Sequence, residues 1–283
     1  MKKKVFIIST IVFVLIFAAL AIFVLPNKKY TFPLYEEKTN ILIVGDSMFC
    51  NNIFGSENLA EYLTKKTDCE MQNCSIGGTC ASKINKNNEL DYYSDKLNFY
   101  NISDIICTGN LASASDNVKS LSVAFPDAYY KLKFLAGTDP AKEDILIINY
   151  GINDCFMRVK CTSDNPYDEY TYGGAMRQGI KRISEKYPDL TIIIPEITYT
   201  TLIQNGERDE AFDEITAEYR EEYNEELKKI ASEYNNVYFF PSSDYIEIND
   251  ENYEDYLFDG IHFNVNGKEA YSSALAEYIG EIK

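Results

Sequence analysis

The chain contains a single histidine, His262, which stands three residues after Asp259. The ordinary pKa of histidine lies near neutral pH, so any proton transfer through imidazole in this chain depends on this residue. Far earlier in the sequence, Ser47 follows Gly45 and Asp46 at the end of an apolar run. A serine, a histidine and an aspartate are the parts of an activated serine nucleophile. Ser47, His262 and Asp259 are therefore candidates for nucleophile, base and orienting carboxylate.

Cleavage of an ester by a serine also needs hydrogen-bond donors for the oxyanion that forms on the substrate. The backbone N–H of Ser47 is one candidate. The backbone N–H of Gly78 is a second, because a residue without a Cβ allows close approach of the substrate. The side-chain amide of Asn153 is a third, and Asp46 and Asp154 are candidate supporting groups. Each pattern alone also fits a turn or a helix cap, but together they favour catalysis.

The segments that must position these groups alternate between short apolar runs and longer amphipathic stretches. Continuous apolar runs are typical of strands that are buried on both faces of a parallel sheet. We predict main strands at residues 41–44, 71–76, 145–148, 191–194 and 237–240, and a minor strand at 105–107. We predict helices at residues 175–186, 211–234 and 267–282. This alternation predicts an α/β fold whose active-site loops gather at the carboxyl ends of the strands.

The N-terminus carries the pattern of a membrane segment. Residues 5–25 are apolar except for Ser9 and Thr10, and three lysines precede them. A helix of this length spans a bilayer, and the lysines place the N-terminus in the cytoplasm and the remainder outside. We expect residues 1–29 to be a cytoplasmic tip and a signal anchor. A cleaved signal peptide, with a processing site near residues 19–21, is the alternative.

The rest of the chain is long enough for one domain with a full core. We predict a linker at residues 30–39 and the domain at 40–283, with 81–143 as a long insertion near the active site. Residues 30–283 carry a formal charge of −22, because all 44 acidic residues but only 22 of the 27 basic ones lie there. Such a surface disfavours nucleic acid as a partner and is compatible with neutral substrates such as glycans or their esters.

The cysteines leave their pairing open. The chain has seven, an odd number, so they cannot all pair within it. Disulfides are permitted outside the membrane, and Cys155 and Cys161 could close a short loop. A zinc site is not expected, because the chain has one histidine and no paired Cys-x-x-Cys motifs.

The motifs resemble those of the SGNH hydrolase superfamily, also called the GDSL esterase/lipase family. The family takes its name from a serine, a glycine, an asparagine and a histidine in four sequence blocks. Here residues 45–48, 73–79, 151–154 and 259–264 resemble these blocks, and the similarity spans about residues 40–282. Met48 replaces the usual leucine and Phe263 the common proline, and neither change alters a reacting group.

The resemblance implies a three-layer α/β/α sandwich with a flavodoxin-like, parallel, five-stranded sheet. It also implies a Ser47–His262–Asp259 triad that works through an acyl-enzyme without metal or organic cofactor, and an oxyanion hole at Ser47, Gly78 and Asn153. Members of the family cleave acetyl and other acyl esters of glycans, lipids and small molecules. We therefore expect an extracytoplasmic carbohydrate esterase, held to the membrane only by its N-terminal helix, that removes O-acetyl groups.

Three other functions remain open from the sequence. A lipase or lysophospholipase needs an apolar groove, for which the insertion offers Leu121, Val123, Phe125, Leu132, Phe134 and Leu135. An acyltransferase to a surface polysaccharide would use the same acyl-enzyme. A glycan-binding module without activity would be expected to have lost catalytic groups, and none is missing here.

Overall fold

The computed structural model describes residues 38–50, 57–84, 96–113, 126–204 and 207–282. No helix within these ranges is long and apolar enough to cross a membrane. The predicted membrane segment at residues 5–25 lies outside the described residues, as does the predicted linker up to residue 37. The described residues belong to one compact unit that begins at Lys38.

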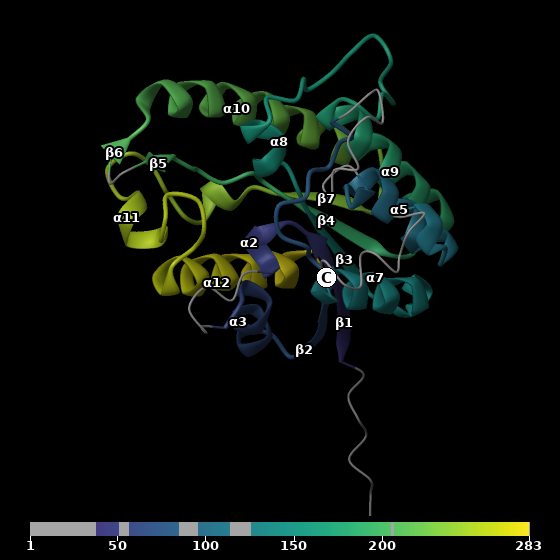
Figure 1. Ribbon diagram of the computed structural model, residues 1–283. Helices are drawn as coiled ribbons and strands as arrows, with labels where there is room; N and C mark the ends of the chain where they lie inside the picture. Colours follow the sequence, from purple (N-terminus) through teal and green to yellow (C-terminus); the bar gives the residue numbers. More distant parts are fainter. Residues whose placement is uncertain (1–37, 51–56, 85–95, 114–125, 205–206, 283) are drawn as a thin grey trace, which may run out of the picture. The chain divides into compact units, whose positions relative to one another are not determined.

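The centre of this unit is a parallel five-stranded sheet (Figure 1). Its strands follow the order β2-β1-β3-β4-β7. Their bounds are β1 (Thr39–Gly45), β2 (Cys69–Asn73), β3 (Ile145–Asn149), β4 (Thr191–Pro195) and β7 (Val237–Phe240). The five predicted main strands are thus confirmed, although β2 ends before residue 76. Strand order changes direction beside β1, the point at which ligands bind in sheets of this kind.

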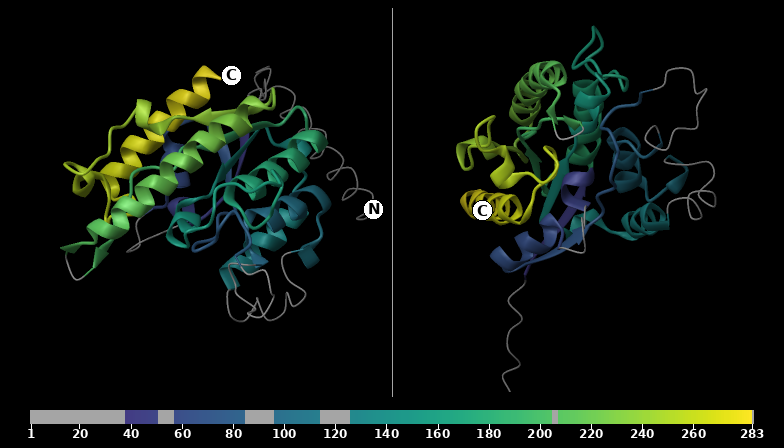
Figure 2. Two further views of the ribbon diagram at one scale, coloured as in Figure 1. Left: turned by 90° about the horizontal axis from the view of Figure 1, so that it is seen from above. Right: turned by 60° about the vertical axis from the view of Figure 1, so that its left-hand side comes forward.

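Helices cover both faces of the sheet (Figures 1 and 2). One face packs on α2 (Ser47–Cys50), α3 (Leu59–Lys66) and α12 (Val265–Glu281). The other packs on α5 (Phe99–Thr108), α7 (Pro126–Gly137), α9 (Tyr172–Lys186) and α10 (Glu210–Ser232). The helices predicted at residues 175–186, 211–234 and 267–282 coincide with α9, α10 and α12. The predicted α/β fold, with helices on both sides of a parallel sheet, is therefore confirmed.

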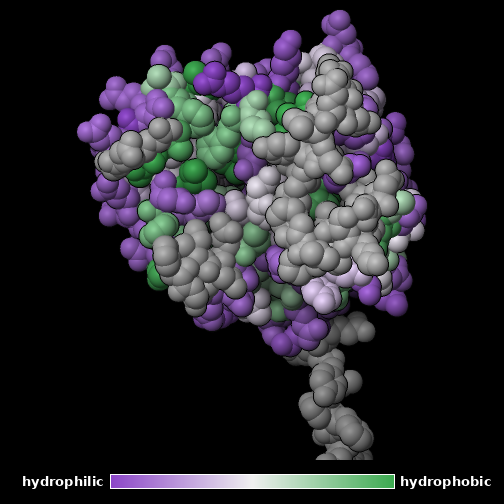
Figure 3. Space-filling model, viewed as in Figure 1, coloured by the Kyte–Doolittle hydropathy of each residue, from purple (hydrophilic) through white to green (hydrophobic). Residues whose placement is uncertain are grey.

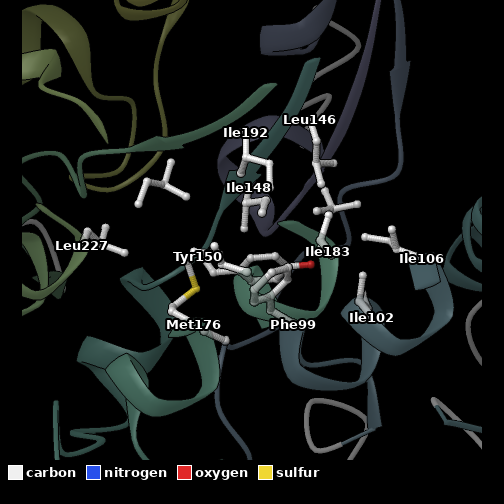
Figure 4. Packing of buried hydrophobic residues seen from close by; sticks show 14 of the residues in the cluster. Phe99, Ile102, Ile106, Leu146, Ile148, Tyr150, Met176, Ile183, Ile192 and Leu227 are labelled. Carbon is white, nitrogen blue, oxygen red and sulfur yellow. The ribbon is translucent and has the colours of Figure 1, made fainter. Parts of the chain in front are cut away.

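Alternate residues of the three central strands, β1, β3 and β4, belong to opposite cores. In β1, Leu42 and Val44 face the core with α5, α7, α9 and α10, whereas Ile41 and Ile43 face the core with α3 and α12. Figure 4 shows the first of these cores, where sheet residues such as Ile148 meet side chains from α5 and α9. Burial on both faces explains why the middle residues of these three strands are apolar, because neither face meets water, whereas the edge strand β2 carries the exposed Glu70.

Shorter elements lie in the connections. They are α8 (Ile152–Phe156), α11 (Tyr253–Tyr256), the 3-10 helices η2 (Leu111–Ser113), η3 (Pro140–Lys142) and η4 (Ser242–Asp244), and a hairpin of β5 (Ile203–Gln204) and β6 (Glu207–Arg208). Helix α8 follows β3, and η4 and then α11 follow β7. They therefore contribute to the loops beyond the carboxyl edge of the sheet.

The minor strand predicted at residues 105–107 was wrong, because these residues lie in α5. Asn98 caps the helix by accepting a hydrogen bond from the backbone N–H of Asn101. Ile102, Ile105 and Ile106 share one buried face, at the spacing of an amphipathic helix. Three apolar residues are too short a run to distinguish a strand from part of a buried helix.

The described part of the predicted insertion contributes to the main core. Leu132 and Leu135 on α7 are buried in it, whereas Phe134 is 48% exposed. Leu121, Val123 and Phe125, the other side chains considered for an apolar groove, lie outside the described residues. The described side chains of this region therefore pack mainly against the sheet.

None of the seven cysteines, which all lie in the described ranges, forms a disulfide. Cys155 and Cys161 are both buried and remain thiols. Burial raises the pKa of the Cys155 thiol well above its ordinary value. Because the thiolate is the reactive form, burial makes this cysteine a packing residue.

The close contact between α9 and α5 allows a test of the packing. At Gly179 on α9, an added Cβ would lie 2.4 Å from a ring carbon of Phe99, which is fully buried. We predict that Gly179→Ala lowers the free energy of unfolding by about 1–3 kcal/mol, despite the higher helix propensity of alanine. Urea denaturation of the full-length protein, followed by circular dichroism, measures the change.

Gly280→Ala on α12 is the matched control, because no atom lies within 4 Å of its added Cβ. This variant should keep or raise the stability, by up to about 1 kcal/mol. Equal effects of the two substitutions would contradict tight packing between α9 and α5.

Candidate active site

The candidate nucleophile lies where β1 turns into α2. Asp46 donates its backbone N–H to the carbonyl of Asn149 on β3 and accepts the N–H of Met48 at Oδ1 (3.0 Å), which fixes the start of α2. Gly45 is required beside this turn, because a Cβ there would lie 2.7 Å from the Asn149 carbonyl oxygen. Ser47 is therefore held at the carboxyl edge of the sheet.

The candidate base lies in the connection between α11 and α12. Asp259 Oδ1 accepts the backbone N–H groups of Ile261 (3.0 Å) and His262 (2.8 Å). Gly260 occupies the left-handed region at φ 84°, which lets the chain turn between the two functional residues. The backbone N–H of Phe258 donates to the carbonyl of His262, and this closes the loop. The local hydrogen bonds thus fix the acid and the base relative to each other.

Three predicted residues meet at this point. His262 Nε2 lies 2.9 Å from Ser47 Oγ, and His262 Nδ1 lies 2.7 Å from Asp259 Oδ2. Burial opposes ionisation of Asp259, but hydrogen bonds from the imidazole and from two backbone N–H groups outweigh it and lower its pKa to about 2. A carboxylate that stays ionised at neutral pH keeps Nδ1 protonated, so Nε2 can accept the serine proton.

The candidate oxyanion donors adjoin the same edge. Gly78 is exposed, has φ 73°, and would meet no atom within 4 Å of an added Cβ, so its backbone faces open space. Asn153 on α8 donates one N–H of its amide to the Thr79 carbonyl at 2.9 Å. An amide nitrogen has two N–H groups, so this bond orients Asn153 while leaving it one N–H for a substrate. The bond also ties the loop after β2 to α8.

The family follows from the sequence match. Residues 108–270 match the family described as GDSL-like Lipase/Acylhydrolase, which is more than half of the chain. The chain belongs to this GDSL-like lipase/acylhydrolase family. The matched stretch includes Asn153, Asp259 and His262, whereas Ser47 and Gly78 precede it. The predicted resemblance to the SGNH hydrolases is thereby confirmed, and the chain is a hydrolase.

Solved structures share the fold of this GDSL-like hydrolase. Est24, described as a carbohydrate acetylesterase from Sinorhizobium meliloti, has a TM-score of 0.51 and 16% identity, with 87% of this chain and 100% of Est24 covered. A protein from Lactobacillus plantarum has a TM-score of 0.53 and 13% identity, with 86% and 97% covered. No curated protein matches the sequence. At these identities the similarity concerns the fold.

Asp154 of the GDSL-like domain holds the loop after β2. Its carboxyl group accepts the backbone N–H groups of Ala81 (2.8 Å) and Ser82 (3.1 Å) and the hydroxyl of Ser82 (2.6 Å). Burial raises the pKa of Asp154 to about 6, against the opposing effect of these three donors. The neighbour of Asn153 thus fixes the segment that follows Gly78.

Asp46 is fully buried, and only one of its two carboxyl oxygens has a hydrogen-bond partner among the described residues. Its Oδ2 has no hydrogen-bond partner among the described residues, and neither do the side-chain oxygens of Tyr150 and Thr200. All three residues line a cavity of about 20 Å³ beside Met48, room for about one water molecule. Burial raises the pKa of Asp46 to about 7. The described residues contain no cluster of three or more acidic, histidine or cysteine side chains that could hold a metal ion.

Two residues that hold the loops of the site in place were not predicted from the sequence. Lys131 on α7 donates to the Ser75 carbonyl at 2.8 Å, and Asn73 bonds both the Ser75 N–H and the Phe49 carbonyl. Asn73 lies in the second family block and was open to this reading. No sequence pattern indicated the role of Lys131, because only the tertiary fold brings α7 to this loop.

The buried Asp46 predicts a pH dependence of stability. The pKa of Asp46 is about 7 in the folded protein and about 3.9 in the unfolded chain. The protonated side chain therefore contributes fully to the free energy of unfolding below about pH 4, and this contribution is lost as the pH rises to about 7. In the variant Asp46→Asn this side chain has no proton to lose. We therefore predict that the stability of wild type relative to Asp46→Asn falls by roughly 1.4 kcal/mol per pH unit between about pH 4 and pH 7.

Urea denaturation of both proteins at a series of pH values measures this difference. Thr162→Ala, which changes an exposed side chain that does not titrate, is the control, and its difference from wild type should stay constant with pH. A constant difference for Asp46→Asn as well would mean that Asp46 ionises equally in the folded and unfolded chains.

Proposed function

We propose that this protein is a serine esterase that removes O-acetyl groups from a carbohydrate through an acyl-enzyme. The observation that carries the proposal is the hydrogen-bonded series Ser47–His262–Asp259, with 2.9 Å and 2.7 Å between the paired atoms. Such a series lets a serine hydroxyl lose its proton as it attacks a carbonyl carbon.

In the first half of the reaction, Ser47 Oγ attacks the ester carbon and its proton passes to His262 Nε2. The electron pair of the carbonyl bond moves to its oxygen, which accepts hydrogen bonds from the backbone N–H groups of Ser47 and Gly78 and from the Asn153 amide. The tetrahedral intermediate then collapses, and the bond to the sugar oxygen breaks. That oxygen takes the proton from His262 and leaves as a free hydroxyl, while the acyl group stays on Ser47.

In the second half, water replaces the sugar. His262 removes a proton from the water as its oxygen attacks the acyl carbon, and the same donors bind the oxyanion. Collapse releases the carboxylic acid and returns the proton to Ser47 Oγ. Asp259 stays ionised throughout and stabilises the imidazolium that forms in each half.

Two features support a short acyl group on a sugar. Hydrophilic residues cover much of the face seen in Figure 3, with apolar residues gathered between them. Est24, which shares the fold, is described as a carbohydrate acetylesterase.

The triad is tested by a graded series of variants. We predict that Ser47→Ala and His262→Ala each lower kcat/KM for p-nitrophenyl acetate by about 10⁴-fold or more, since each removes a reacting group. Asn153→Ala should lower kcat by about 10²–10³-fold, since it removes one oxyanion donor. The rates are measured with the full-length protein.

Ser163→Ala is the control, because this exposed serine bonds only within its own loop. It should retain the wild-type rate. Wild-type activity in either Ser47→Ala or His262→Ala would rule out the proposed mechanism.

The acyl preference separates the proposed esterase from a lipase. We predict that kcat/KM for p-nitrophenyl acetate exceeds that for p-nitrophenyl octanoate by at least about 10-fold, since a site built for an acetyl group discriminates against additional methylene groups. Exposed apolar side chains such as Met157 and Phe258 are the features that favour the alternative. Faster cleavage of the octanoate would identify a lipase, and transfer of acetyl to an added sugar would identify an acyltransferase.

We propose that the apolar run at residues 5–25 holds this esterase in the membrane with the domain outside the cytoplasm. The three preceding lysines and the length of the run support this orientation. We predict that the full-length protein stays with membranes after carbonate washing and that protease added to intact cells digests the domain. A protein found in the medium without about residues 1–21 would instead indicate a cleaved signal peptide.

A further inference from the structure

A second cavity, of about 220 Å³, lies along the carboxyl edge of the sheet. The segment after β4, helix α10 and the segment after β7 line it, and Tyr271 of α12 closes one side. It is smaller than the roughly 300–1,000 Å³ that is typical of sites for drug-sized ligands. Its size therefore suits one small ring.

Arg220 of α10 lines this cavity, and no carboxylate of the described residues pairs with it. Its Nη1 is buried and has no hydrogen-bond partner in the described part of the chain. Its guanidinium lies 5.2 Å from the ring centre of Tyr199. By contrast, Arg177 and Arg208 each pair with two carboxylates. A buried guanidinium with an unused donor costs free energy in the folded state unless something binds it.

The acids near Arg220 are already bound elsewhere. Asp213 pairs with Arg208 at 3.0 Å. Glu196 accepts the Ser243 N–H at 2.7 Å and the hydroxyls of Ser242 and Ser243. Burial lowers the pKa of Arg220, and the nearby carboxylates of Glu196 and Asp213 oppose this only in part. The donor of Arg220 is therefore available to a ligand.

The lining selects the kind of ligand. Glu196 and the exposed Glu247 place two carboxylates beside the single cation of the cavity lining, which disfavours an anion. The same groups suit a molecule that both donates and accepts hydrogen bonds. Ile246 and Ile248 add an apolar wall. A ring with several hydroxyl groups and one apolar face meets all of these conditions.

The cavity adjoins the catalytic loops. Glu196, Ile197, Thr198 and Tyr271 line both this cavity and the smaller one that Asp46 and Met48 also line. A few residues farther along the segment after β4, the Thr201 N–H donates to the Gly260 carbonyl at 2.8 Å. A ligand here would thus be separated by this shared wall from the turn of Asp46 and Met48, which carries the candidate nucleophile.

We propose that this cavity is a subsite for one neutral sugar residue of the substrate chain, with Arg220 donating to a ring or hydroxyl oxygen and Glu247 accepting from a hydroxyl. The inference rests on the proposed function for its substrate, but binding of an unacetylated sugar chain needs no catalysis. It can therefore be tested separately from the esterase activity.

The experiment uses the full-length protein and ester-free oligosaccharides, with binding followed by saturation-transfer NMR. The neutral probes are xylotetraose, cellotetraose and chitotetraose, and tetragalacturonic acid is the acidic probe. At least one neutral probe should bind, and Arg220→Met should weaken it by about tenfold or more, because the variant lacks the buried donor. Glu247→Gln changes an exposed side chain, keeps the fold, and should also weaken binding.

Lys229→Met is the matched control, because it removes a mostly exposed positive charge from the same helix. It should bind like wild type. The subsite is overturned if no neutral probe binds, if both Arg220→Met and Glu247→Gln bind like wild type, or if the acidic probe binds more tightly than the neutral ones. If binding depends on Arg220 but no acetylated sugar is cleaved, the subsite stands and the proposed function fails.

Discussion

Burial of β1 on both faces is the constraint on which the rest of the structure depends. Residues 41–44 are completely inaccessible to water, so helices must cover both sides of the sheet. Parallel strands need helical crossovers, and these crossovers supply the covering layers. The same arrangement brings the carboxyl ends of β1, β2 and β3 to one edge. The Ser47 turn and the loops that carry Gly78 and Asn153 are therefore neighbours as a result of how the core is covered.

The strands and the residues of the candidate site were predictable from the sequence because their sequence patterns are local. Continuous apolar runs predicted four of the five strands, all except β2, and the four loop motifs predicted the residues that the structure places at one edge. The contacts between distant segments were not predictable. Lys131 reaches Ser75 only because α7 packs over the loop after β2, and the apolar residues 105–107 belong to a helix because their neighbours share its buried face. Such pairings depend on the tertiary fold, which one sequence does not specify residue by residue.

The buried acids illustrate a balance between stability and function. Burial of the Asp154 carboxyl group costs free energy, but hydrogen bonds from three donors offset this cost and fix the loop that carries Gly78. Asp46 has a single donor on one oxygen and none described on the other, and Arg220 has an unused donor of its own. Replacement of buried charged groups by apolar side chains of the same size is often neutral or stabilising in proteins. Groups that are incompletely satisfied in this way are concentrated near the carboxyl edge, where ligands are expected to bind.

The positions of the reacting residues along the chain have a further consequence. Ser47 follows the first strand, whereas Asp259 and His262 precede the last helix. During synthesis, nearly the whole domain is made before the base exists, and α12 must then pack on the sheet before the imidazole can reach the serine. An incomplete chain thus holds a serine without its base. Under the proposed mechanism, the domain can act as an esterase only after His262 has been made and placed beside Ser47.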